Sequence, residues 1–70
     1  MDRQYSMRKV SQIVDVSVGM LRKWAHDGFI VPNKTPLGHF RYNDSHIAFI
    51  KADDFLSKRN EFYNKLQEEP

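Results

Sequence analysis

Cationic side chains that can bind phosphate or read bases gather in two neighbouring segments of this 70-residue chain. The first segment, residues 17–23, carries Arg22 next to Lys23, and the second, residues 34–41, ends in Arg41. A guanidinium group presents a fork of N–H donors that fits phosphate oxygens and guanine edges, whereas an ammonium group binds phosphate as a point charge. The two segments therefore predict a surface that binds a polyanion.

The charge of the chain is unevenly distributed along its length. Residues 1–41 carry seven Lys and Arg against three acids, a net charge of +4, and residues 42–70 carry four against six, a net charge of −2. A basic first half with an acidic second half is typical of a protein with one face for a polyanion. An excess this small also fits an ordinary charged surface.

The composition argues against several other kinds of chemistry. Without cysteine there is no disulfide scaffold and no cysteine zinc site, which suits a reducing cytoplasm. His26, His39 and His46 fall in three different expected elements and lack the spacing of a metal site. No nucleophile–base pair or glycine-rich phosphate loop is present, so we expect no enzyme activity, no cofactor and no metal. No apolar run reaches membrane-spanning length, and the charged N-terminus is unlike a signal peptide, so no membrane partner is expected.

Two short helices must position the first cationic segment. Ser6 fits the N-cap of a helix over about 7–14, and Ser17 fits the N-cap of a second over about 18–26. Gly28 follows where a left-handed C-cap is needed. Helices joined by so short a turn are typical of a helix-turn-helix, although an ordinary helical hairpin has the same local pattern.

A β-hairpin must position the second cationic segment. The apolar run 29–31 and the alternating segment 39–42 predict its two strands, and the turn-rich segment 33–38 joins them. This is the size of hairpin called a wing. Trp24 and Tyr42 are expected in the core rather than as stacking platforms for single strands.

Two further helices complete the prediction. Asn43 fits the N-cap of a third helix that starts near Asp44. Its expected core residues are Ile47, Ala48, Phe49 and Ile50. A polar fourth helix is expected over about 53–67, with an apolar stripe formed by Phe55, Phe62 and Leu66. The stripe is expected to pack on its own domain, and self-association is the alternative.

The order of these parts resembles the DNA-binding head of the MerR family over about residues 5 to 50. The resemblance is carried by Tyr5-Ser6, Val16-Ser17, Leu21-Arg22-Lys23-Trp24, Gly28-Phe29-Ile30 and the string from Lys34 to Tyr42. It implies a winged helix-turn-helix, mainly α, with three to four helices and a two-stranded wing. The expected organisation is a head at 1–52 followed by a C-terminal helix and tail at 53–70.

The resemblance also implies where DNA binds. The second helix would lie in the major groove, and the wing would reach the backbone or the adjacent minor groove. The contact residues expected on the helix are Ser17, Val18, Gly19, Arg22 and Lys23. Those expected on the wing are Lys34, Thr35, Gly38, His39 and Arg41. Ser17 as a cap alone and His39 as a packing residue are the alternatives.

The function implied is sequence-specific binding of double-stranded DNA by a small stand-alone transcriptional regulator of bacterial or phage origin, in the cytoplasm. The alternative is an excisionase that binds repeated sites and bends DNA beside an integrase or other recombinase. The N-terminal part of a serine transposase and a protein-interaction module are further alternatives. Because one head contacts few phosphates, several copies are expected to bind adjacent sites, as a dimer or a head-to-tail row.

Overall fold

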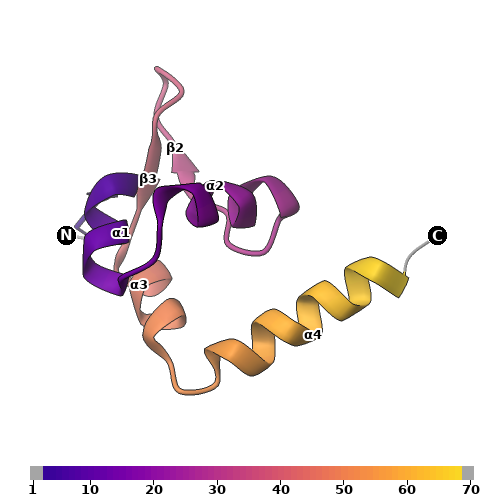
Figure 1. Cartoon of the computed structure of the whole chain (residues 1–70). Helices are drawn as coiled ribbons and strands as arrows, with labels where there is room; N and C mark the ends of the chain where they lie inside the picture. The colour runs from indigo at the N-terminus through magenta and orange to yellow at the C-terminus, as the bar shows by residue number, and fades with distance from the viewer. Residues whose placement is uncertain (1–2, 69–70) are drawn as a thin grey trace.

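A computed structural model of the chain describes residues 3–68 and shows four helices around a small sheet (Figure 1). Residues 1–2 and 69–70, at the ends of the predicted head and tail, lie outside the described residues. The elements are β1 (Tyr5–Ser6), α1 (Met7–Val14), α2 (Val18–Asp27), β2 (Asn33–Lys34), β3 (Phe40–Tyr42), α3 (Asp44–Lys51) and α4 (Phe55–Glu68). The predicted fold class, mainly α with a small β wing, is confirmed.

Helices α1 and α2 begin and end at the predicted capping residues. The side chains of Ser6 and Ser17 each accept a hydrogen bond from the backbone N–H three residues later, at 3.2 and 3.1 Å. Gly28 ends α2 in the left-handed region with φ 86°. Between the helices Asp15 is left-handed with φ 56°, which aspartate tolerates better than most residues. These local bonds define the helix-turn-helix.

The first strand of the wing lies further along the chain than predicted. The run 29–31 is an irregular connection, and β2 is Asn33–Lys34 instead. The backbone N–H groups of Phe29 and Ile30 donate to the carbonyl of Trp24 at 2.9 and 3.3 Å, so they complete the end of α2. The Ile30 side chain is buried. The apolar run therefore fills the core rather than a strand ladder.

A third strand, β1, joins the sheet on the other edge of β3. The strands are antiparallel in the order β1-β3-β2, with Tyr5 opposite Tyr42 and Ser6 opposite Arg41. The Tyr5 hydroxyl donates to the Asp44 carboxylate at 2.8 Å, which ties β1 to the start of α3. The hairpin of β2 and β3 is the predicted two-stranded wing. The third strand was not predicted, because a two-residue strand has no alternating pattern to read.

The core lies between α1, α2, β3 and α3, and the start of α4 closes it. Val10 and Tyr42 are at most 1% exposed, and Trp24 is 2% exposed, so the predicted core role of both aromatic residues is confirmed. Edge-to-face contacts join Trp24 to Phe29 and Phe55, with ring centroids 5.8 and 5.4 Å apart. In a chain this short, this aromatic cluster is a large share of the buried apolar surface.

Helix α3 begins with a reciprocal cap that includes a histidine. The Asn43 side chain accepts from the His46 N–H at 3.1 Å, and His46 Nδ1 accepts from the Asn43 N–H at 3.0 Å. Nε2 lies 3.0 Å from the Val31 carbonyl, which can only accept, so Nε2 is the donor in this contact. Ile50 is buried, whereas Ala48 is exposed, so its predicted core position was wrong.

Helix α4 packs its first turns on the aromatic cluster. It begins at Phe55, two residues later than predicted, because residues 53–54 form the turn from α3. Phe55 is buried, and the ring centroid of Phe62 lies 5.1 Å from that of Phe29. Leu66, near the end of the helix, is 43% exposed. The predicted apolar stripe thus contacts its own domain through two of its three residues.

A polar lock joins α4 to the end of α2. The Tyr63 hydroxyl donates to the Asp27 carboxylate at 2.9 Å, and the Lys23 ammonium donates to the same oxygen at 3.1 Å. Lys23 and then Tyr63 hold the pKa of Asp27 below its ordinary value. Burial, followed by the hydrogen bond to Asp27, raises the pKa of Tyr63 to about 12.

The Tyr42 hydroxyl is buried and has no hydrogen-bond partner within residues 3–68. We expect Tyr42→Phe to leave stability unchanged or to raise it by up to about 1 kcal/mol, because it removes an unsatisfied polar group without removing packing. Urea unfolding followed by the fluorescence of Trp24, the single tryptophan, measures this change. Tyr63→Phe is the matched control and should lower stability, because its hydroxyl is paired. Equal losses in the two variants would contradict the prediction.

The polar lock formed by Asp27, Lys23 and Tyr63 makes the stability of the fold depend on pH in the acidic range. Because the folded-state pKa of Asp27 is lowered, its contribution is present above the ordinary value of 3.8 and is lost as pH falls through the folded-state value. Asp27→Asn should therefore unfold more easily than the unaltered chain at pH 7 and should lose less stability between pH 5 and pH 2. Urea midpoints across this pH range check the difference. Parallel pH profiles would show that the lock contributes nothing.

Candidate nucleic-acid interface

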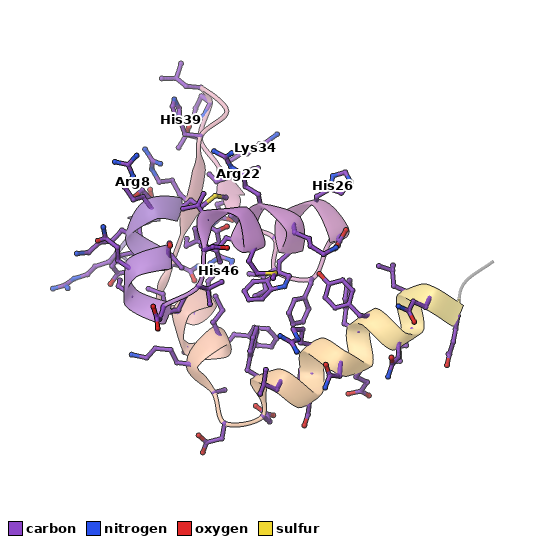
Figure 2. The ribbon with its side chains drawn as sticks, in the orientation of Figure 1. Arg8, Arg22, His26, Lys34, His39 and His46 are labelled. Atoms are coloured by element: carbon purple, nitrogen blue, oxygen red, sulfur yellow. The ribbon has the colours of Figure 1, made fainter. Side chains whose placement is uncertain are left out.

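An open groove of about 620 Å³ lies between the first turns of α1 and α2 on one side and the wing, residues 33–42, on the other. We call it the wing groove. Its lining residues are Ser6, Met7, Arg8, Val18, Arg22, Gly38, His39, Phe40 and Arg41. The groove brings together five of the predicted contact residues, two from α2 and three from the wing. Figure 2 shows Arg8, Arg22, Lys34 and His39 on the same side of the molecule, where the wing projects.

Arg22 reaches the wing groove because of the helical period of α2. Leu21 and Trp24 are 1% and 2% exposed and face the core. Arg22 therefore stands away from the core, and it shares the groove with Val18, one turn earlier. The predicted placement of Arg22 beside the wing is what the geometry shows, and the contact of Arg22 with DNA stays a prediction.

The tip of the wing is a turn closed by three hydrogen bonds. Thr35 N–H donates to the His39 carbonyl and Gly38 N–H donates to the Thr35 carbonyl, each at 2.9 Å. The Thr35 hydroxyl also accepts from the His39 N–H at 3.2 Å. Gly38 has φ 86°, a conformation that glycine adopts without strain. Thr35 and Gly38 therefore shape the tip, and His39 is presented on its exposed side.

Arg41 is held in the groove by its own strand. Its Nη1 donates to the Phe40 carbonyl at 2.9 Å. A guanidinium has five N–H donors, so most of them stay available to a ligand. Phe40 packs against the core from the same strand, and it forms part of the apolar lining of the groove.

The remaining predicted residues lie outside the lining of the wing groove. Lys23 belongs to the lock with Asp27, and its ammonium lies 5.4 Å from the centre of the Tyr63 ring, on the side of α4. Ser17 caps α2, and Gly19 is exposed in the first turn of that helix. Lys34 is exposed on the wing, with its ammonium 5.6 Å from the centre of the Phe40 ring.

Four lining residues were not predicted as contacts, namely Phe40 of the wing and Ser6, Met7 and Arg8 at the start of α1. The N-cap at Ser6 places Arg8 in the first turn of α1, and this position could have been predicted from the sequence. Its proximity to the wing, however, depends on the pairing of β1 with β3. Local sequence patterns do not predict a pairing between strands so far apart in the chain.

The charged side chains that line the wing groove are all cationic. No carboxylate belongs to its lining, and none of its three arginines forms an ion pair with any residue of 3–68. Two acids, Asp53 and Asp54, lie in the turn between α3 and α4, at the opposite end of the molecule from the wing (Figure 1). The charges of the groove therefore favour an anion there.

The histidines do not form a metal site within the part of the chain that the structure describes. The three histidines lie on α2, on the wing and on α3 (Figure 2), and His46 is engaged in the cap of α3. Among the described residues no three His, Asp or Glu side chains gather as a metal site would require. Within that same part of the chain, every helix is too short or too polar to cross a membrane.

Comparison with family models gives a match to the MerR HTH family regulatory protein over residues 5–59. The matched span covers the helix-turn-helix, the wing, α3 and the first turn of α4. Comparisons with curated proteins and with solved structures return no match. The family match agrees with the order of elements and with the positive groove between α2 and the wing. The chain therefore belongs to the MerR family of helix-turn-helix regulatory proteins.

Proposed function

We propose that this chain is a small regulator of transcription that binds a specific site on double-stranded DNA. The observation that carries the proposal is that Arg22 of α2 and Arg41 of the wing line one positive groove on the projecting side of the molecule. Family membership supports the DNA-binding part of the proposal. A DNA duplex is the polyanion that a helix and a neighbouring hairpin on one face can bind together.

In this proposal α2 lies in the major groove and the wing follows the backbone. The start of α2 is suited to close approach, because Gly19 is exposed and has no Cβ. Arg22, one turn further, would reach a guanine edge or a phosphate. His39 and Lys34 would meet the backbone or minor groove from the wing.

Several copies are proposed to bind together, because one head offers few phosphate contacts. In the apolar stripe, for which self-association was the alternative to packing on its own domain, Phe55 and Phe62 contact Phe29 in the same chain. Leu66 is the stripe residue left exposed. The stripe is therefore largely occupied within its own chain and offers little surface through which copies could pair.

A footprint over the DNA around the gene of this protein tests the proposed function. Protection of a short site near the promoter supports a regulator. Equal affinity for every duplex, without a protected site, would contradict sequence-specific binding. Protection restricted to the attachment sites of a neighbouring integrase gene would contradict a regulator and favour an excisionase.

Arg22→Ala should weaken binding to the footprinted site by about 1–3 kcal/mol, mostly at one base position if the guanidinium reads a base. Fluorescence anisotropy with the site and with single-base variants of it measures both effects. Lys65→Ala, which removes the same charge from α4, is the control and should change little. Unaltered affinity in Arg22→Ala would remove this residue from the interface.

Arg41→Ala should weaken binding to specific and unrelated duplexes alike, because a wing residue is proposed to hold the backbone. The slope of log K against log salt concentration should fall in magnitude by about 0.9 for one lost phosphate contact. Titrations at several salt concentrations give the slope. A loss confined to one DNA sequence would show instead that Arg41 reads a base.

A further inference from the structure

We propose that Arg8, at the start of α1, binds a backbone phosphate together with Arg22 and Arg41, so that the wing groove is a three-arginine phosphodiester site. This inference rests on the proposed binding of DNA and adds a third element to it. α2 and the wing are the elements expected to contact DNA, whereas Arg8 comes from α1.

The first argument is electrostatic. Three guanidinium groups line one groove, no carboxylate lines it with them, and none of the three is ion-paired among residues 3–68. Like charges that share a concave surface repel one another, and the repulsion is relieved when an anion enters. The wing groove is thus arranged for a negative ligand from outside.

The second argument concerns the lining between the charges. Met7, Val18 and Phe40 are partly buried and contribute apolar surface to the groove. Apolar walls lower the effective dielectric constant, so hydrogen bonds from a guanidinium to phosphate oxygens are stronger there than on an open surface. The stems of the arginine side chains can lie along the same apolar surface.

The third argument is positional. Pairing of β1 with β3 places Ser6 opposite Arg41, so the first turn of α1 lies beside the strand that carries the wing arginine. Figure 2 shows Arg8 and Arg22 on the same side of the molecule, on two different helices. A phosphate in the groove would therefore be bound from α1, α2 and β3 at once. Such a contact would set the position of α2 on the duplex without reading its sequence.

Arg8→Gln tests the proposal, with Lys65→Gln as the matched loss of one charge on α4. Both residues are exposed, so both variants should fold, which the thermal midpoint and Trp24 fluorescence verify. Binding of the full chain to a short duplex of arbitrary sequence is measured over a series of sodium chloride concentrations. Arg8→Gln should reduce the magnitude of the salt slope by about 0.9 and weaken binding several-fold, and Lys65→Gln should leave the slope unchanged.

Each other result would overturn the assignment of Arg8. An unchanged slope in Arg8→Gln, while the unaltered chain binds the duplex, overturns this inference and leaves the proposed function standing. An equal loss in Lys65→Gln shows an effect of net charge, not of the groove. Absence of duplex binding by the unaltered chain overturns the inference and the proposed function together.

A second arm separates a DNA phosphate from a free one, since both present the same oxygens. Inorganic phosphate is titrated into the isotope-labelled chain, and the amide resonances of Met7, Arg8 and Gly38 are followed by NMR. Weak binding without saturation at micromolar concentrations is expected, because a free ion lacks the rest of the duplex. Saturation at micromolar phosphate would identify a free anion as the ligand and overturn the assignment to DNA.

Discussion

The pairing of β3 along both of its edges holds the N-terminal strand and the wing in place beside the core. β1 binds one edge and β2 the other, so three residues of chain connect the N-terminus, the wing and the core. Neighbouring side chains of a strand point to opposite faces. Tyr42 therefore enters the core while Arg41 lines the wing groove. Displacement of β3 by one residue would turn Tyr42 out of the core and Arg41 into it.

The small core and the positive groove are kept on different sides of the molecule. The aromatic cluster around Trp24 and Phe29 is closed by α4, which crosses the side away from the wing (Figure 1). A chain of this size has little apolar surface to bury, so the helix that completes the core is needed for stability. Because α4 takes that side, the starts of α1 and α2 stay free beside the wing. The face that packs against α4 and the face that carries the wing groove are therefore different.

Much of the secondary structure could be predicted, because its signals are local. Ser6, Ser17 and Asn43 each accept from a backbone N–H within their own helix, and Gly28 adopts the left-handed conformation at the end of α2. Such bonds join residues three or four positions apart, and side-chain chemistry alone favours them. The strand predicted at 29–31 is absent, because the signal there does not depend on local bonds. An apolar run is equally suited to a strand and to a core connection, and only the neighbours decide.

Local signals in the sequence specify which residues cap each helix, which face of α2 is apolar, and that cationic side chains fall on α2 and on the wing. Which of these side chains meet depends on the packing of the elements. Arg22 and Lys23 are adjacent, yet Arg22 lines the wing groove while Lys23 is held by Asp27 and lies against Tyr63 of α4. Arg8 joins the groove through a strand pairing between residues far apart in the sequence, Tyr5 with Tyr42 and Ser6 with Arg41. The physical reason is that capping acts within one helical turn, whereas the choice of partner for a charge depends on how distant elements pack.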